Sequence, residues 1–381
     1  MTTLFTDDFQ VFIKPVGARC NLRCSYCYYK DKGDIYGPDA PSVMNDETLE
    51  NCIKQHFLAS SGDTVLFTWH GGEPLLAGID FYKKALYLQK RYLSQGKNVL
   101  NGIQTNGTLI TDEWCKFFAD NGFVIGISID GPEVFHNAMR HTSRQCGSFE
   151  KTAGGYKLLR EYGVNAEILC VVSACNVRRP LLVYDFFKML GANFITFLPL
   201  VEKNADGQVS PESVPALEFG LFLTTIFDEW KKKDIGAVKI QIFEEALRTA
   251  FHQEHSLCIF RERCGGVPVI EHNGDFYPCD HFVGKNRSLG NINEQPLYDF
   301  LNHPAQKAFG DAKLNALPQY CMRCEVREMC RGECPKNRCI TSPDGEPGLN
   351  YLCEGYKHFF NHCKPFIDAV RYARALGMEN K

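Results

Sequence analysis

The sequence predicts an α/β protein in which a partial (β/α)6 barrel over residues 1–232 is followed by a small cysteine-rich domain over 233–381. Three observations lead to this prediction. Short apolar runs alternate with amphipathic segments from Phe12 to about Trp230, this regularity fades after Asp234, and 11 of the 18 cysteines form one group on each side of the boundary. Strands that alternate with helices imply a parallel sheet covered by helices.

The barrel is built from alternating elements that can be placed in order along the chain. Six apolar runs are expected to be its strands, at residues 11–15, 64–70, 101–106, 124–130, 166–172 and 194–200. Amphipathic segments between them are expected to be helices, at residues 46–60, 81–94, 112–121, 149–162 and 181–190. In such barrels ligands bind at the carboxyl ends of the strands, so site residues are expected where each run ends.

Composition and charge exclude several classes of partner. The 381 residues are 44% hydrophobic and 23% charged, with a net charge of -3, which is ordinary for a globular protein and predicts neither a nucleic-acid nor a membrane partner. No basic region leads into an apolar run at the N-terminus and no stretch of 18 apolar residues occurs, so a cytoplasmic location is expected. In that reducing compartment 18 thiols favour metal binding over disulfides.

The first cysteine group directly follows the first expected strand. Cys20, Cys24 and Cys27 are spaced as CxxxCxxC. Three thiolates leave one iron of a cubane cluster without a protein ligand, and an open metal position is what chemistry on a bound small molecule requires. The alternative is a three-cysteine zinc site with a missing fourth ligand.

A second cysteine array occupies the C-terminal domain. Its eight thiols match two closed cubane clusters, and they are Cys258, Cys264, Cys279, Cys321, Cys324, Cys330, Cys334 and Cys353. A treble-clef or ribbon zinc module is the alternative, because CxxC followed by further cysteines is typical of both. Seven thiols remain outside this scheme and are interpreted as packing residues, although Cys339 lies close to the array; they are Cys52, Cys115, Cys146, Cys170, Cys175, Cys339 and Cys363.

Polar residues follow the expected strands in the order that a ligand site at the barrel mouth requires. Gly71-Gly72-Glu73-Pro74 follows the second strand, Gln104 to Thr108 ends the third, and Ser128 to Pro132 ends the fourth. Each segment alone also fits a simple turn. Together they favour a pocket for a nucleotide-like ligand.

This combination resembles the radical S-adenosylmethionine (SAM) superfamily. The resemblance implies that Cys20, Cys24 and Cys27 hold a 4Fe-4S cluster whose open iron binds SAM, from which a 5'-deoxyadenosyl radical is released. It also implies SAM contacts from the residues that match the family's motifs, which are Tyr29, Gly71, Gly72, Glu73, Asn106, Ser128, Asp130, Arg140 and the backbone near Val201.

The C-terminal array resembles the SPASM extension of peptide-modifying radical SAM enzymes. That resemblance assigns Cys258, Cys264, Cys279 and Cys334 to one auxiliary 4Fe-4S cluster and Cys321, Cys324, Cys330 and Cys353 to another. The phrases TWHGGEP, IQTNGTLIT, SIDGP, ILCVV, YPCDHF and LGNI are similar to the anaerobic sulfatase-maturating enzymes. Such enzymes oxidise a cysteine or serine in a Cys/Ser-x-Pro-x-Arg motif of an unfolded or nascent sulfatase to Cα-formylglycine, and take electrons from a flavodoxin or ferredoxin.

Asp280 directly follows the expected ligand Cys279. By the resemblance it is the general base that deprotonates the substrate thiol or hydroxyl, while its alternative interpretation is a turn residue. His70, Tyr277 and His281 are candidates for substrate contacts, although His70 fits a core histidine equally well. Two rival functions remain: a SPASM enzyme that forms thioether or carbon–carbon crosslinks, and a non-catalytic iron–sulfur carrier or zinc-stabilised module.

Overall fold

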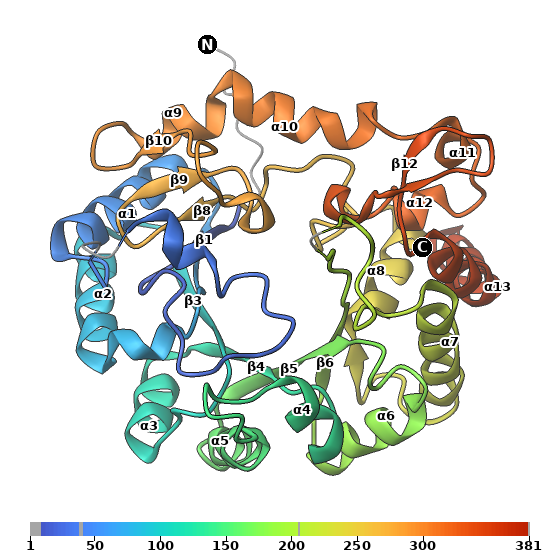
Figure 1. Ribbon diagram of the computed structural model, residues 1–381, viewed down its shortest axis with the longest axis horizontal. Coiled ribbons are helices and arrows are strands. Elements are labelled where there is room, and N and C mark those ends of the chain that lie inside the picture. Colours follow the sequence, from blue (N-terminus) through green and yellow to red (C-terminus); the bar gives the residue numbers. More distant parts are fainter. Residues whose placement is uncertain (1–8, 38–40, 205, 380–381) are drawn as a thin grey trace. The chain divides into compact units, whose positions relative to one another are not determined.

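The computed structural model describes residues 9–37, 41–204 and 206–379. The chain divides into two compact units (Figure 1). Unit 1 comprises residues up to 128, 139–166 and 264–311, and unit 2 comprises 129–138, 167–263 and 312 onward. Each unit contains residues from both sides of position 232, and the domain boundary expected there stays a prediction.

Unit 1 is built on a sheet whose central strands are parallel. In the described part of this unit the strand order is β10-β9-β8-β1-β2-β3-β4. The bounds are β1 Val11–Ile13, β2 Thr64–Trp69, β3 Asn98–Thr105, β4 Val124–Ser128, β8 Val269–Ile270, β9 Asp275–Tyr277 and β10 Gly290–Asn291. Strands β1 to β4 pair in parallel, and β1 also pairs in parallel with β8. The hairpin of β8 and β9 thereby brings the segment before Cys279 to the edge of the parallel strands.

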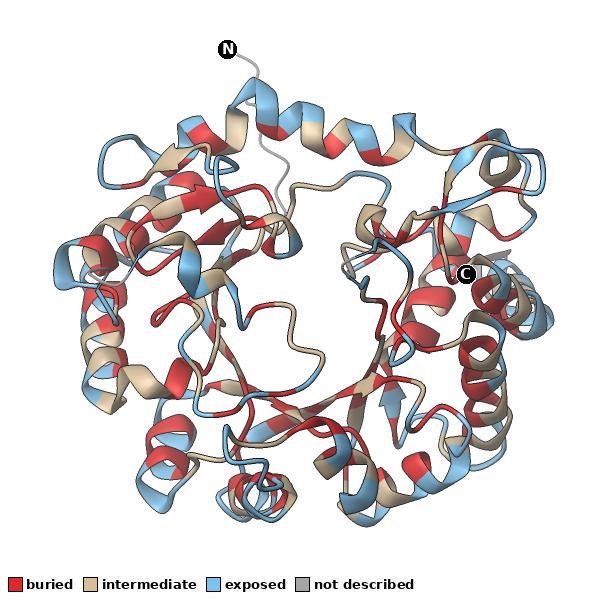
Figure 2. Ribbon diagram, in the orientation of Figure 1, coloured by how far each residue is buried: buried red, intermediate tan, exposed pale blue. Residues whose placement is uncertain are grey.

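Helices cover one side of these strands because alternate strand residues are apolar. In β2 the buried residues are Val65, Phe67 and Trp69. Phe67 packs against Phe57 of α1 and Trp69 against Tyr82 of α2, with ring centroids 5.5 and 5.6 Å apart. Figure 1 shows α1 and α2 on one side of the strands and the loop after β1 on the other, and Figure 2 shows that the buried residues concentrate along the strands. The loop side is therefore left for a ligand site.

Of the helices that begin in unit 1, α1, α2, α3 and α5 agree with expected segments, whereas α9 and α10 were not expected. Their bounds are α1 Asp46–Ala59, α2 Ile79–Tyr92, α3 Asp112–Asn121, α5 Phe149–Glu161, α9 Leu297–Asn302 and α10 Pro304–Asn315, with short 3-10 turns at Lys32–Ile35, Pro74–Ala77 and Asp280–Phe282. Asn45 and Thr111 cap α1 and α3 by accepting from the backbone N–H of Thr48 and Trp114.

Unit 2 contains parallel strands and a pair of long helices. Strands β5 Asn165–Val172, β6 Phe194–Pro199 and β7 Lys239–Ile240 pair in parallel in that order. A short hairpin joins β11 Ile340–Thr341 to β12 Pro347–Leu349. The helices are α4 Glu133–Met139, α6 Pro180–Met189, α7 Ala216–Lys233, α8 Gln241–Ala250, α11 Gln319–Met322, α12 Arg327–Cys330 and α13 Cys353–Glu379, with a 3-10 turn at Pro335–Asn337.

Helices α7 and α13 approach each other closely through glycine. A Cβ atom added at Gly355 would lie 2.0 Å from the carbonyl oxygen of Ala216, and one added at Gly220 would lie 2.4 Å from that of Gly355. Each of the six expected strand segments overlaps one strand of the structure, β1 to β6 in order. The expected α/β class with parallel strands is therefore confirmed. None of the helices in the described residues is long and apolar enough to cross a membrane.

Candidate active site

The first cysteine group lies in the loop that follows β1. Cys20, Cys24 and Cys27 line a pocket of about 370 Å³, to which Gly72 and His272 also contribute. The backbone N–H of Leu22 points to Cys20 Sγ at 3.4 Å, and the Nδ2 of Asn106 lies 3.7 Å from the same sulfur. N–H groups directed at a thiolate sulfur are typical of iron–sulfur sites.

The donor set of this loop fits a 4Fe-4S cluster. Burial raises the pKa of Cys20 to about 12, so that its thiol stays neutral unless a metal ion replaces the proton. In the described part of the chain, no three Cys, His, Asp or Glu side chains converge on one point in the way that a single metal ion requires. A cubane does not need this convergence, because each of its irons takes a separate thiolate.

The glycine motif after β2 holds the cysteine loop by its backbone. The N–H of Gly72 donates to the carbonyl of Gly17 at 2.8 Å, and that of Glu73 donates to the carbonyl of Arg19 at 2.9 Å. A Cβ atom at Gly72 would lie 2.1 Å from the Arg19 carbonyl oxygen, so only glycine permits this approach. The motif thus fixes the residue that precedes Cys20.

The carboxylate of Glu73 is buried and fastens the end of β3 to the same motif. It accepts hydrogen bonds from Leu75 N at 3.0 Å, Thr105 Oγ1 at 2.7 Å and Asn106 N at 2.8 Å. Burial raises the pKa of Glu73 to about 7, although these three donors oppose the shift. Glu73 and Asn106 are therefore parts of one hydrogen-bonded frame around the cysteine loop.

Asp280 is buried at the start of the 3-10 turn that follows β9 and Cys279. Its Oδ1 lies 2.5 Å from the Nζ of Lys14, and its Oδ2 accepts a hydrogen bond from the hydroxyl of Tyr28. Burial alone would raise the pKa of Asp280, but the charge of Lys14, together with His70 and His281, outweighs it and holds the pKa well below its usual range. Asp280 is therefore a carboxylate at neutral pH.

His70 lies at the end of β2, next to the same lysine. Its Nδ1 accepts from the N–H of Gly71 at 2.8 Å and is 3.1 Å from the Nζ of Lys14, and its ring stacks on Phe12. Desolvation and the nearby Lys14 charge lower the pKa of His70 to about 3. A neutral imidazole carries one proton, and because Nδ1 accepts a hydrogen bond, that proton is on Nε2.

The remaining candidate substrate residues have different surroundings. Tyr277 is buried, and the hydroxyl of Tyr36 donates to its hydroxyl at 3.3 Å. His281 is exposed, and its ring lies 4.7 Å from that of Tyr28. His281 thus contacts the ring of Tyr28, whose hydroxyl donates to the Asp280 carboxylate.

The expected SAM-contact residues occupy polar positions near the strand ends. In unit 1, the hydroxyl of Tyr29 donates to buried Glu271, Ser128 Oγ accepts from Gln104 at 3.1 Å, and the guanidinium of Arg140 lies over the ring of Tyr26 at 5.4 Å. In unit 2, Asp130 Oδ1 accepts from Val171 N at 3.0 Å, and the carbonyl of Val201 accepts from Lys336. Their roles toward SAM stay predictions.

The cysteines expected to hold auxiliary clusters are distributed over both units. Cys321, Cys324, Cys330 and Cys353 lie in unit 2 on α11, α12, the turn between them and the first residue of α13. Burial raises the pKa of Cys353 to about 12, and the neighbouring Cys321 and Cys324 contribute to the shift. Cys264 and Cys279 belong to unit 1, and Cys258 and Cys334 to unit 2. The assignment of these thiols to individual clusters stays a prediction.

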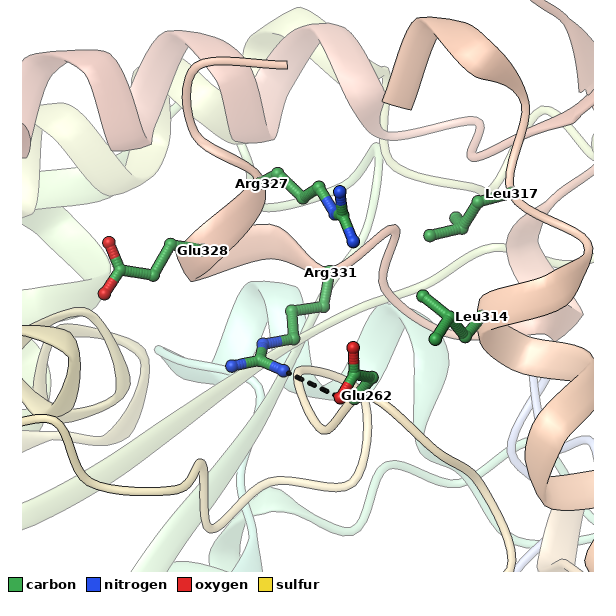
Figure 3. Close-up of a pocket in the computed structure, with 6 residues that line it drawn as sticks. All are labelled: Glu262, Leu314, Leu317, Arg327, Glu328 and Arg331. Carbon is green, nitrogen blue, oxygen red and sulfur yellow. Dashed lines mark ion pairs between the residues drawn. The ribbon is translucent and has the colours of Figure 1, made fainter. Parts of the chain in front are cut away.

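A second pocket, of about 300 Å³, lies in unit 2 (Figure 3). It is lined by Glu262, Leu314, Leu317, Arg327, Glu328 and Arg331, and an ion pair of 3.6 Å joins Arg331 to Glu262. It contains none of the residues predicted to bind cofactor or substrate. The pocket at the first cysteine group is therefore the candidate active site.

Comparisons with known proteins agree with this choice. The radical SAM superfamily profile matches residues 15–174, and the profile of the iron-sulfur cluster-binding SPASM domain matches residues 258–325. A serine-type anaerobic sulfatase-maturating enzyme of Bacteroides thetaiotaomicron is 43% identical over 96% of this chain and 92% of its own length. The chain belongs to the anaerobic sulfatase-maturating enzymes.

Relatives of both types support membership of the sulfatase-maturating enzymes. A cysteine-type enzyme of Clostridium perfringens strain 13 is 32% identical over 93% of this chain and 96% of its own length. The structure of native anSMEcpe with bound AdoMet matches with a TM-score of 0.86 at 30% identity, over 95% of this chain and 99% of that one. The expected fold class is confirmed, and the two family profiles confirm SAM and iron–sulfur clusters as cofactors.

Sequence reasoning missed three residues of this sulfatase-maturating enzyme's candidate site. Lys14, Tyr28 and Glu271 contact Asp280 or Tyr29, yet none was a candidate. A lysine inside the apolar run before Pro15 was the one available signal, because a charged residue in a buried strand requires a partner.

Proposed function

We propose that this chain oxidises a cysteine or serine within a Cys/Ser-x-Pro-x-Arg motif of an unfolded or nascent sulfatase to Cα-formylglycine. The observation that carries the proposal is the buried Asp280 carboxylate, which directly follows Cys279 and lies in the same unit as the pocket of the first cysteine group. The relatives support the substrate class, since both serine-type and cysteine-type sulfatase-maturating enzymes match nearly the whole chain. A related structure was solved with a bound Cp18Cys peptide.

We expect the clusters and SAM to be bound by the cysteines and by polar residues near the strand ends. Cys20, Cys24 and Cys27 would hold the cluster that binds SAM, and the eight further cysteines would hold two auxiliary clusters in the sets that the sequence predicts. When bound, these groups supply hydrogen-atom abstraction from the substrate and acceptance of the released electrons. Tyr29, Gly71, Gly72, Glu73, Asn106, Ser128, Asp130, Arg140 and the Val201 backbone would hold SAM.

Asp280 would take the proton of the substrate thiol or hydroxyl. The charge of Lys14 keeps it ionised at neutral pH, which is the form that a base needs. Oδ1 forms an ion pair with Lys14 at 2.5 Å, and a carboxylate oxygen has two lone pairs, so one of them remains for a substrate donor. Removal of that proton makes the substrate radical easier to oxidise.

Replacement of Asp280 by asparagine tests this function. Asn keeps the size and loses the basic carboxylate, so aldehyde formation should fall by about 100-fold or more, the scale of general-base effects, while 5'-deoxyadenosine formation persists. The measurement is anaerobic incubation with SAM, reductant and a Cys-x-Pro-x-Arg peptide, in which both products are quantified by mass spectrometry.

The matched control is Asp299→Asn, which makes the same change at an exposed carboxylate of α9. It should leave both products unchanged. Aldehyde formation at a near-normal rate in Asp280→Asn would show that Asp280 is not the base. A peptide product without aldehyde but with an internal crosslink in the wild type would favour the rival crosslinking function instead.

The electron donor and location complete the proposal. A flavodoxin or ferredoxin would reduce the clusters, and the cytoplasm would keep 18 thiols and their clusters reduced. Replacement of a chemical reductant by flavodoxin with its reductase in the peptide assay tests the donor.

A further inference from the structure

Lys14 is a buried lysine that the proposed reaction does not yet use. It directly follows β1, and its own N–H donates to the carbonyl of Ile270 at the end of β8, at 2.9 Å. Because Ile13 is in register with Ile270, and Ile270 with Phe276 of β9, the two strand pairings fix the position of Lys14 relative to the hairpin that leads to Asp280.

The side chain of Lys14 is fully buried among polar and aromatic groups. Its Nζ lies 2.5 Å from Asp280 Oδ1, 3.1 Å from His70 Nδ1 and 4.2 Å from the centre of the Tyr29 ring. A buried ammonium is stable only beside a counter-charge, and Asp280 is the one carboxylate with which Lys14 forms an ion pair among the described residues. The lysine and the aspartate therefore hold each other in place.

Tyr28 holds the other oxygen of the same carboxylate. Its hydroxyl donates to Oδ2, while Lys14 contacts Oδ1. Residues of two separate segments therefore bind the two oxygens of the carboxylate. A carboxylate whose two oxygens both have partners cannot rotate about the Cβ–Cγ bond without losing one of these contacts. Its orientation toward a substrate is therefore set before the substrate arrives.

We propose that Lys14 is a positioning residue that sets the orientation of the Asp280 carboxylate. The proposal rests on the proposed role of Asp280 as the base. Lys14 touches no substrate in this scheme and acts only through Asp280. Without it the carboxylate keeps its bond to Tyr28 but is free to turn, and displacement of a reacting group by about 1 Å costs up to about 100-fold in rate.

The test replaces Lys14 by methionine, which has a similar length and no charge. The ratio of aldehyde to 5'-deoxyadenosine should fall by about 10-fold or more, while the peptide KM stays within about 3-fold. A readout that needs no turnover is amide hydrogen exchange of residues 280–283 in peptide-free enzyme, which should become faster. An unchanged product ratio would overturn the proposal, and so would unchanged exchange.

Lys32→Met is the matched control. Lys32 also lies over the Tyr29 ring, at 5.7 Å, but its Nζ donates to the carbonyl of Val283 and forms no ion pair with Asp280 in the described residues. Its replacement should leave the product ratio unchanged. A fall equal to that of Lys14→Met would show that any loss of positive charge near Tyr29 has this effect, which overturns the proposal.

A double variant separates failure of this inference from failure of the base assignment. If Lys14 acts through Asp280, then Lys14→Met with Asp280→Asn should lose no more aldehyde than Asp280→Asn alone. Additive losses would overturn the inference and leave the base in place. A normal product ratio in Asp280→Asn would overturn both.

If Lys14→Met does not fold, Lys14→Gln provides the same comparison, because its amide still donates a hydrogen bond to the buried carboxylate. Its ratio should lie between the wild type and Asp280→Asn. A wild-type ratio in Lys14→Gln would overturn the proposed need for the ammonium group.

Discussion

At the scale of single residues, buried titratable groups in this enzyme differ in whether they have partners. Asp280 and Lys14 neutralise each other, whereas His56 of α1 is buried against Phe67 and its Nδ1 has no hydrogen-bond partner among the described residues. Burial lowers the pKa of His56 to about 3, with a smaller contribution from Lys97. A histidine that burial keeps neutral makes the free energy of unfolding depend on pH.

His56→Leu should remove that dependence. The folded state holds the pKa of His56 below the usual 6.5, so the unfolded chain binds more protons as the pH falls from 6.5 toward 3. The free energy of unfolding therefore falls by about 1.4 kcal/mol for each pH unit below 6.5. Above pH 6.5 the burial of neutral His56 causes no such loss. Thermal unfolding at pH 7.5 and 5.5 should show a smaller drop in Tm for the variant than for the wild type. Exposed His252, replaced by Asn, should behave as the wild type, and an equal drop in all three proteins would contradict the assignment.

Single residues were also the scale at which sequence reasoning was least complete. The cysteines and the glycine motif were found because their spacing is specific, and the structure brings Cys20, Cys24, Cys27 and Gly72 to one pocket. Lys14 and Tyr28 carry no such spacing, and their contacts with Asp280 join positions more than 250 residues apart in sequence. Only the fold brings these side chains together.

At the scale of elements, the turn after β2 controls the cysteine loop. The contact of Gly72 with the Arg19 carbonyl leaves no room for a side chain. Strands β2 to β6 and the helices between them were predictable because each has enough residues to show a hydrophobic period. Strands β8 and β9, with two and three residues, are too short to show one, so the pairing of β8 with β1 was not predicted.

Gly72→Ala should therefore damage the first cluster selectively. Its methyl group would lie 2.1 Å from the Arg19 oxygen and push away the segment that carries Cys20. Anaerobically reconstituted protein should lose about four iron atoms per chain, which is one cubane, together with SAM cleavage. The control is Gly154→Ala in α5, where an added Cβ meets nothing within 4 Å. There alanine should keep all the iron and stabilise the helix by about 0.5–1 kcal/mol. Full iron content in Gly72→Ala would contradict the proposed role of Gly72 in holding the segment that carries Cys20.

At the scale of the whole molecule, the cysteines are predicted to divide into one set for an open cluster and two sets for closed clusters. Two family profiles cover the first cysteine group and much of the second array, which confirms the general organisation expected from spacing alone. The sets of four within the array were predictable only through the resemblance to a family. Sequence spacing does not say which thiols meet in space.

The iron content of the protein tests the predicted assignment of cysteines to clusters directly. Three cubanes hold about twelve iron atoms per chain, and the combined Cys20→Ala, Cys24→Ala and Cys27→Ala variant should hold about eight. Iron and acid-labile sulfide analysis of anaerobically purified protein gives both values. Replacement of Cys52, Cys115 and Cys170 by alanine is the control, because these buried thiols lie outside the clusters and their loss should leave the iron unchanged. Equal iron in the wild type and the first triple variant would contradict the ligand assignment.

The pairing of β1 with β8 has a consequence for how such enzymes diversify. Strand β1 begins the barrel, while β8 belongs to the cysteine-rich part of the chain, and their shared register aligns Lys14 with the segment before Asp280. The two parts are thus not independent modules that recombination can exchange freely. A transplanted C-terminal half would bring its own counterpart of Asp280, but Lys14, the ion-pair partner of Asp280, would remain with the host. A shift of one residue between the strands would also turn alternate side chains to the opposite face. New peptide-modifying activities are therefore expected to arise more readily through changes in the loops around a preserved strand pair than through exchange of whole halves.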